Sequence, residues 1–417
     1  MMVSTAKTKV VVRGPCLTQS GYGEHARMVL RALRAKEDEL DIYIVPVGWG
    51  QTGWKHEDTE ERKWLDQKIS LTQNAIQEKM QFDISIQVAI PNEWQKIAPV
   101  NVGVTAGIET TKVTPDWIQK ANEMDKVIVV SNHSKQLFDQ TVYEGQDQFG
   151  NPAKLTCTTP VDVVHFPVRN IDPDENFSLD LEYDFNYIFV GQWGIRKNID
   201  HMLKWWLEEN WSEEVGLILK VSHLKNNIYD KDHTLKRIEH ICRSVQLDRD
   251  EKKCKVYLIH GDMSDEEMTA MYNHPKVSCM ISATHGEGFG LPMFEFALTG
   301  KPIAATDWSG HLDFLTAPKD SDIKSKCFLP ISYTLQPVQE QAVWNGVIEK
   351  DFMWAYPHDG SFKQKIRQVR KNYAKWQSRA EKLKALIEKN FDIESINKKL
   401  IDAIPYNFDD ELDIVVI

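Results

Sequence analysis

The chain has 417 residues, a length that predicts two large domains or three small ones. Its 50 basic and 61 acidic residues give a net charge of −11, which argues against a general nucleic-acid coat or an anionic-membrane protein, since both are usually basic. A hydrophobic content of 42% and a charged content of 27% are typical of globular proteins and exclude collagen-like, disordered and low-complexity classes.

The first part of the chain, residues 1–170, predicts a parallel α/β domain. Short β-branched runs alternate with helical segments, as in sheets covered by helices on both faces. Strands are expected at 10–12, 42–47, 84–88, 102–105, 127–130 and 161–164, and helices at 22–35, 115–123 and 134–141. A segment rich in Pro, Asp and Asn at 171–186 fits a linker.

The same alternation restarts and predicts a second α/β domain over residues 187–390. Strands are expected at 187–190, 216–221, 256–260, 277–282 and 303–306, and helices at 200–209, 231–245, 265–272 and 292–299. Residues 316–360 look irregular, and a long helix is expected at 362–389. A last helix at 393–403 belongs to a tail, 391–417, that we expect to return to the N-terminal domain. The predicted fold is therefore two doubly wound domains facing across a cleft, with ligands at the carboxyl ends of their strands.

Targeting signals and cysteines indicate the compartment. No apolar run approaches the ~20 residues that a membrane helix needs, and the first 16 residues lack a secretory pattern. The six cysteines form no CxxC pair and no zinc spacing. We therefore expect a cytoplasmic protein with no membrane span and reduced cysteines.

The most informative segment is 285–314, HGEGFGLPMFEFALTGKPIAATDWSGHLDF. Its loop glycines allow close approach to a ligand, and amides at 289–293 should be free at a helix start to bind an anion or hydroxyl. Glu287 in the loop and Glu295 one turn into the helix add acidic acceptors that suit a sugar and a ribose. The alternative is that both glutamates only stabilise the helix dipole.

This segment resembles the E-x7-E region of GT-B retaining glycosyltransferases, especially their family four. The resemblance implies that Glu287 contacts the donor sugar and Glu295 the nucleotide ribose. It places the donor-binding loop at Gly288, Phe289, Gly290 and Leu291.

The segment 187–200, YIFVGQWGIRKNID, puts two cations, Arg196 and Lys197, at a helix N-terminus, which favours anions. A bound diphosphate resolves this conflict, although a solvated pair is the commoner case for such a dipeptide alone. The segment resembles the first strand and loop of the second GT-B domain, which implies that Lys197 binds the diphosphate. The family often has Arg where this chain has Gln192, so Arg196 or Lys220 is expected to supply the second cation.

The segment 14–27 satisfies G-x-G-x-x-A at Gly21, Gly23 and Ala26, with Asp41 twenty residues beyond Gly21. A dinucleotide site, and hence an NAD-dependent dehydrogenase, is one interpretation. However, the first glycine lies too far from the strand end for that fingerprint. We prefer the GT-B interpretation, in which this loop approaches the donor phosphates and the acceptor.

Three residues are expected on the acceptor side of the site. Glu109 in VTAGIETTKVTPDW lies in a segment that resembles the family pattern after the fourth strand. His165 ends the last strand of the N-terminal domain, and His285 lies beside the glycine loop. Each has a structural alternative, as a helix-start acid or a buried histidine.

The resemblance implies transfer of a sugar from a nucleoside diphosphate sugar with retention at the anomeric carbon. We expect no cofactor and no metal, because the two D-x-D strings, at 172–174 and 248–250, do not follow core strands. Acceptors of three kinds fit: a glycan, a lipid or a modified DNA base. The last follows from the stretches IPNEWQKIAP, TAGIETT and TDWSGHLDF, which resemble glycosyltransferase-like proteins of tailed phages and imply the host cytoplasm.

A basic stretch at 361–390 carries seven Lys and three Arg against two Glu. It is expected to be a solvated helix face, with contact to DNA or a membrane as the alternative. A non-catalytic protein that binds sugar or nucleic acid therefore remains a further interpretation. So does a GT-B-like phosphorylase or epimerase, which would share the cleft but would not need an acceptor hydroxyl.

Overall fold

A computed structural model describes residues 7–146, 149–224, 226–246, 251–318 and 326–406. The chain forms two compact units. Unit 1 comprises residues 1–107, 112–166 and 394–417, and unit 2 comprises 108–111 and 167–393. Within the described residues, each helix is too short or too polar to cross a membrane.

Unit 1 contains a six-stranded parallel sheet in the order β2-β1-β3-β4-β5-β8. Its strands are β1 (Thr8–Gly14), β2 (Leu40–Pro46), β3 (Ile84–Val88), β4 (Val100–Thr105), β5 (Lys126–Val129) and β8 (Val161–Val163). Its helices are α1 (Gly21–Arg34), α2 (Glu60–Gln77), α3 (Pro115–Asn122), α4 (Asn132–Gln140) and most of α12 (Ile393–Ala403).

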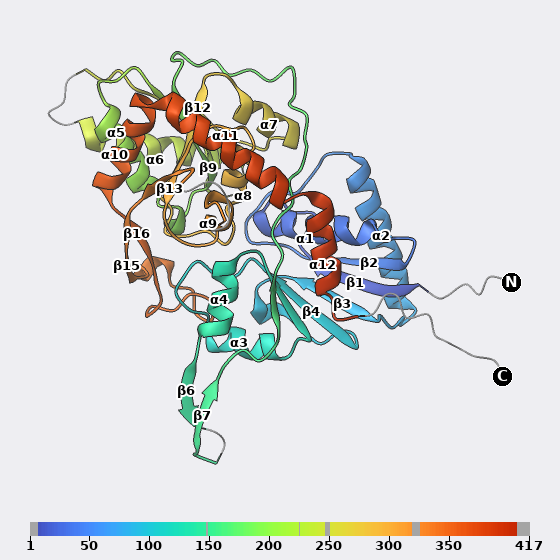
Figure 1. The fold of residues 1–417 in the computed structure, drawn as a ribbon. Coiled ribbons are helices and arrows are strands. Elements are labelled where there is room, and N and C mark those ends of the chain that lie inside the picture. The colour runs from blue at the N-terminus through green and yellow to red at the C-terminus, as the bar shows by residue number, and fades with distance from the viewer. Residues whose placement is uncertain (1–6, 147–148, 225, 247–250, 319–325, 407–417) are drawn as a thin grey trace, which may run out of the picture. The chain divides into compact units, whose positions relative to one another are not determined.

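Unit 2 contains a second six-stranded parallel sheet in the order β11-β10-β9-β12-β13-β14. Its strands are β9 (Asn186–Gln192), β10 (Gly216–Ser222), β11 (Lys255–Ile259), β12 (Val277–Ser282), β13 (Ile303–Thr306) and β14 (Leu329–Ile331). Its helices are α5 (Ile199–Asn210), α6 (Ile228–Gln246), α7 (Asp265–Asn273), α8 (Leu291–Ala297), α9 (Leu312–Leu315), α10 (Asp359–Lys371) and α11 (Tyr373–Asn390). Figure 1 labels most of these elements.

Apolar strand residues and helix stripes form the core of unit 2. Tyr187, Leu217 and Cys279 from the sheet pack with Trp206 from α5 and Phe362 from α10, and all five are fully buried. Burial of this kind stabilises each large side chain by roughly 1.5–3 kcal/mol. The sheet is therefore a fixed platform for the loops that leave its carboxyl edge.

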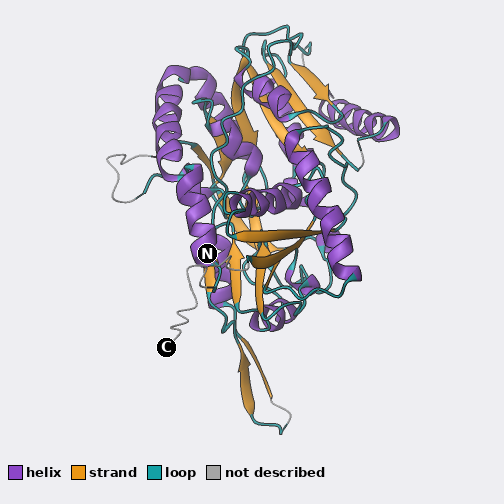
Figure 2. Cartoon of the chain, turned by 90° about the vertical axis from the view of Figure 1, so that its right-hand side faces the viewer, coloured by secondary structure: helices purple, strands orange, loops and turns teal. Residues whose placement is uncertain are grey.

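Two antiparallel hairpins depart from the predicted pattern. The first, β6 (Tyr143–Gln146) with β7 (Pro152–Leu155), projects from unit 1, as both Figure 1 and Figure 2 show. The second, β15 (Tyr333–Pro337) with β16 (Met353–Pro357), lies in a region that the sequence predicts as irregular. That prediction is wrong. The strand was missed because β15 is mostly exposed and lacks the apolar alternation that marks a half-buried strand.

Two helical predictions also need correction. Helix α2 is absent from the predictions because only four of its eighteen residues are buried, so its apolar stripe is weak. The predicted helix at 362–389 is two helices, because the chain breaks at Asn372 between α10 and α11.

The basic residues of α10 do not form a free cationic face. Lys363 pairs with Glu208 at 2.6 Å, Arg367 with Glu209 at 2.6 Å, and Arg370 with Glu213 at 2.7 Å. The acidic partners all lie on or just after α5. Three of the five basic residues of α10 are therefore neutralised within unit 2.

Candidate active site

Two neighbouring strands carry the loops of the candidate site. β9 and β12 pair in parallel, so their carboxyl ends lie at one edge of the sheet. The 3₁₀ turn η2 (Ile195–Lys197) follows β9, and the glycine loop follows β12. The strand order reverses between β9 and β12, and ligands of doubly wound sheets bind at such a switch point.

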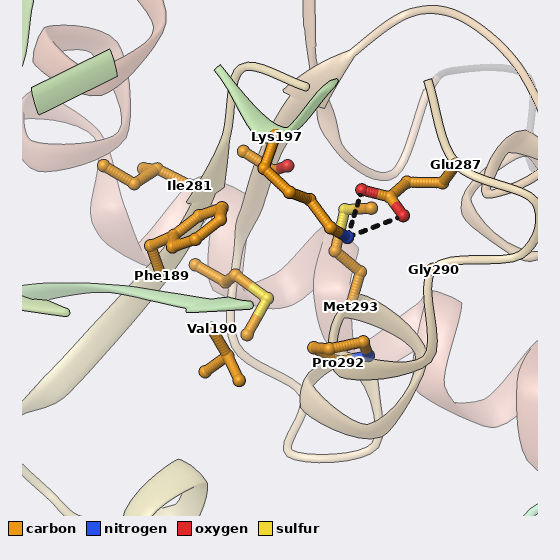
Figure 3. Close-up of a pocket in the computed structure, with 10 residues that line it drawn as sticks. Phe189, Val190, Lys197, Ile281, Glu287, Gly290, Pro292 and Met293 are labelled. Atoms are coloured by element: carbon orange, nitrogen blue, oxygen red, sulfur yellow. Dashed lines mark hydrogen bonds and ion pairs between the residues drawn. The ribbon is translucent and has the colours of Figure 1, made fainter. Parts of the chain in front are cut away.

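At this point Lys197 and Glu287 form a close ion pair. Lys197 Nζ donates to both carboxylate oxygens of Glu287 at 2.8 Å, as the dashed lines of Figure 3 show. Arg196 Nη1 lies 3.1 Å from Glu287 Oε2 and donates to the Gly286 carbonyl at 2.6 Å. The pair borders a small pocket with mainly apolar walls, lined also by Phe189, Val190, Met280, Ile281, Ser282, Gly290, Pro292 and Met293.

Glu109 completes the cluster from a segment far away in the sequence. Residues 108–111 belong to unit 2, and Glu109 Oε1 lies 3.1 Å from Arg196 Nη1. A Cβ on Gly286 would lie 2.8 Å from the Glu109 Cβ, so the close approach of the two segments requires glycine. The sequence predicts a diphosphate between the two cations, whereas in the structure two carboxylates balance their charge.

Burial and neighbouring charges shift the pKa values of Glu287 and Glu109 in opposite directions. Burial alone would raise the pKa of Glu287, but Lys197 and Arg196 lower it to about 2. For Glu109, burial prevails over Arg196 and raises the pKa above its usual range. Burial also lowers the pKa of Lys197, against the opposing effect of Glu287. Arg196, with 31% of its side chain exposed against 17% for Lys197, is the more accessible cation.

Two residues that the sequence analysis did not select hold the loops together. Asn198 has a left-handed backbone (φ 54°), and its side-chain Nδ2 donates to the Ala283 carbonyl at 2.9 Å. Ser309, also at positive φ, accepts the Glu287 amide with its hydroxyl at 2.8 Å. The Ser309–Gly310 dipeptide is a turn signal that points to this role.

The glycine loop is tightly packed. A Cβ on Gly310 would lie 1.9 Å from the Gly288 carbonyl oxygen, and Gly290 takes φ 93° as it precedes α8. Phe289 is buried against other aromatic rings of unit 2, and Leu291 is the first residue of α8. The sequence predicts free amides at 289–293. The Met293 amide instead donates to the Gly290 carbonyl at 2.9 Å, so it is not available to a ligand.

Other residues selected from the sequence make different contacts in unit 2. Gln192 donates to the His223 carbonyl at 3.3 Å, and Lys220 to the Gly261 carbonyl at 2.6 Å. Glu295 is exposed on α8 and accepts a hydrogen bond from the Tyr272 hydroxyl at 3.4 Å.

His285 is 2% exposed, and both of its ring nitrogens face protein groups. The D-x-D string at 172–174 precedes β9, and the one at 248–250 lies outside the described residues. In the part of the chain that is described, His, Cys, Asp and Glu side chains form no cluster of three or more suited to a metal ion.

The glycines of the first loop and His165 lie in unit 1. β1 ends at Gly14, and α1 begins at Gly21. The Gly23 backbone amide donates to Ser20 Oγ at 2.9 Å, which caps the start of the helix. His165 follows β8 and is half-buried.

Asp41 lies near the amino end of β2, paired in register with Lys9. The loop glycines follow the carboxyl end of β1, five positions further along the strands. At ~3.3 Å per residue, Asp41 lies roughly 16 Å along the sheet from the carboxyl end of β1. A dinucleotide fingerprint needs the acidic residue near the loop, so this arrangement does not fit it.

No protein-family model matches the chain, and no curated protein matches it. Solved structures do match. Sucrose-phosphate synthase from Thermosynechococcus elongatus has a TM-score of 0.60 at 13% sequence identity, over 95% of this chain and 98% of that one. HepE of Anabaena, in complex with UDP and glucose, has a TM-score of 0.57 at 14% identity, with 95% and 98% covered.

A glycosyltransferase from Rickettsia africae ESF-5 has a TM-score of 0.57 at 13% identity, again over 95% and 98% of the two chains. Together with the two parallel sheets, these similarities show a two-domain, Rossmann-like GT-B fold. The fold class predicted from the sequence is confirmed.

Proposed function

We propose that this chain is a retaining glycosyltransferase of the family-four type, which moves a sugar from a nucleoside diphosphate sugar to an acceptor hydroxyl. One observation carries the proposal: Lys197, Arg196 and Glu287 converge where strand order reverses between β9 and β12. HepE, which shares the fold, was solved with UDP and glucose, and this supports a sugar nucleotide as the donor.

In this proposal, the cations stabilise the leaving diphosphate. Negative charge develops on the diphosphate as the glycosidic bond breaks, and fixed cations beside it lower the barrier. Arg196 is the more exposed of the two cations, and Lys197 borders the pocket. These two residues supply the positive charge, so the proposed reaction requires no metal.

Glu287 is proposed to contact the donor sugar and Glu295 the ribose, with Glu109 on the acceptor side. Because Glu287 has a pKa of about 2, it is an anion at neutral pH and accepts hydroxyl hydrogen bonds. The acceptor is a glycan, a lipid or, following the phage-like stretches, a hydroxymethylated DNA base.

A donor panel tests the proposal. UDP-, GDP-, ADP- and TDP-sugars are incubated with the full chain in EDTA, and released nucleoside diphosphate is measured together with thermal shift. We expect one nucleotide class to stabilise the chain and to be slowly hydrolysed, with the anomeric configuration of the released sugar retained. Absence of binding and turnover across the panel, with and without added Mg²⁺ or Mn²⁺, contradicts the proposal.

A further inference from the structure

The β15–β16 hairpin contacts both segments that carry carboxylates of the site. The Ala355 amide donates to the His285 carbonyl at 3.1 Å, and the Met353 amide to Thr111 Oγ1 at 3.3 Å. Amides two residues apart point to the same side of a strand, so one edge of β16 makes both contacts. Glu287 lies two residues after His285, and Thr111 two residues after Glu109.

The hairpin is held in place by a small buried core of its own and by ring contacts with His285. Trp354, Phe352 and Val338 form a small buried core of their own at the loop end of the hairpin. The Trp354 ring also stacks on His285, with centroids 4.8 Å apart and planes within 6°. The next residue along β16 after Ala355, Tyr356, adds a tilted ring contact at 4.7 Å.

The hydrogen bonds of His285 define its tautomer. Nδ1 lies 2.7 Å from the Ala355 carbonyl oxygen, which only accepts, so Nδ1 carries the proton. Nε2 then offers a lone pair, which accepts from the Gln339 amide nitrogen at 3.1 Å. Burial lowers the pKa of His285 to about 4, and nearby His201 on α5 and Arg196 on η2 act in the same direction.

We propose that the hairpin is a positioning element of the site, and that neutral His285, held between Ala355 and Gln339, is the positioning residue that couples it to Glu287. The inference rests on the proposed function. By holding His285 and Thr111 on one strand edge, β16 sets the spacing of the two carboxylates around Arg196. Misplacement of reacting groups by about 1 Å is enough to cost on the order of 10²-fold in rate.

Substitution of Gln339 provides the first test. Gln339→Ala removes the donor to His285 Nε2, and we expect kcat to fall about tenfold with the donor KM within about twofold, because reacting-group geometry is lost and nucleotide contacts are kept. Gln336→Ala is the matched control, since Gln336 lies on the same hairpin and bonds only locally to Thr334. Equal kcat for Gln339→Ala and the control overturns the inference.

Gln339→Glu gives a readout that a merely structural role would not move. Above the pKa of His285 in this variant, a carboxylate and a lone pair face each other, and we expect the loss seen in Gln339→Ala. Below it, Nε2 gains a proton and donates to the new carboxylate, so activity should recover toward wild type as pH falls through that pKa. A pH profile parallel to that of Gln339→Ala contradicts the proposal.

Nuclear magnetic resonance of the His285 ring nitrogens separates this inference from the proposed function. We expect the Nδ1-protonated neutral tautomer throughout pH 5–8 in the wild-type chain, and a ring that gains its second proton at a higher pH in Gln339→Glu than in the wild type. If the donor panel fails but these signals appear, the glycosyltransferase proposal is wrong, and the hydrogen bonds that hold His285 between Ala355 and Gln339 stand. If the wild-type His285 ring titrates near neutral pH, the proposed arrangement of a neutral ring held between Ala355 and Gln339 is ruled out, whatever the activity.

Discussion

Strand order reverses beside the first strand of each sheet: between β1 and β3 in unit 1, and between β9 and β12 in unit 2. In unit 2 the loops after these strands meet through ionised side chains, Lys197 and Arg196 against Glu287. In unit 1 the loop after β1 folds back on itself, and Arg27 donates to the Cys16 and Thr18 carbonyls at 2.9 Å.

The comparison shows that topology provides a place for a site, and that side chains decide what is built there. In unit 1, Gly14 packs so closely that a Cβ would lie 3.1 Å from the Val88 Cβ and 3.2 Å from the Ala26 Cβ. In unit 2 the equivalent space holds a charge cluster beside a small pocket. Four predictions test this difference.

The largest effect is expected at Lys197. Lys197→Met should lower kcat by ~10²–10³-fold, because a fixed cation next to developing negative charge is lost. Steady-state kinetics with the donor found in the panel provide the measurement. Lys204→Met, on the exposed face of α5, is the control. Activity within twofold of wild type removes Lys197 from the mechanism and reduces the cluster to a structural role.

The second effect concerns stability and pH. The folded-state pKa of Glu287 is about 2, below the 4.5 of an unperturbed glutamate. Its contribution is therefore fully present above pH 4.5 and is lost as pH falls toward 2, while the lowered pKa of Lys197 offsets part of it at neutral pH. Glu287→Gln should lower stability at pH 7 and flatten the stability profile between pH 4.5 and 2, measured by urea unfolding.

The control for this pH experiment is Glu266→Gln, which neutralises an exposed carboxylate on α7. If the Glu287→Gln and Glu266→Gln profiles have the same slope, the ion pair in unit 2 does not stabilise the fold.

The third effect tests the packed loop of unit 1. A Cβ on Gly23 would lie 2.1 Å from the Thr18 carbonyl oxygen, whereas Gly21 has open space around it. Gly23→Ala should destabilise the chain by about 1–3 kcal/mol through overpacking, and Gly21→Ala should leave urea unfolding nearly unchanged. Equal stability of the two variants would show that the loop around Gly23 is less closely packed than the 2.1 Å distance to Thr18 indicates.

The smallest effect is expected at Glu295. Glu295→Ala should raise the donor KM about tenfold with little change in kcat, because a ribose contact acts equally in the ground and transition states. A fall in kcat at unchanged KM places Glu295 with the reacting groups instead. Tyr272→Phe, which removes the hydroxyl that donates to Glu295, shows whether that hydrogen bond orients the carboxylate.

The sequence by itself determined the alternating elements and the two segments that carry Lys197 and Glu287. Buried parallel strands are continuous β-branched runs, and turn glycines mark the loops that follow them, so local patterns are enough. Each cation and carboxylate was found beside its own strand, although nothing local indicated that they pair with each other.

Only the tertiary structure decided that Glu109 joins Arg196 and that β16 holds His285. These contacts join residues 87 and 70 positions apart (196 − 109; 355 − 285), and they depend on how strands and loops come together in space. The hairpin was unpredicted because β15 buries little apolar surface, and the neutral His285 followed only from the two groups that face its ring. Such long-range pairings leave no periodic trace in the chain, since each partner satisfies its charge or hydrogen bond only after folding.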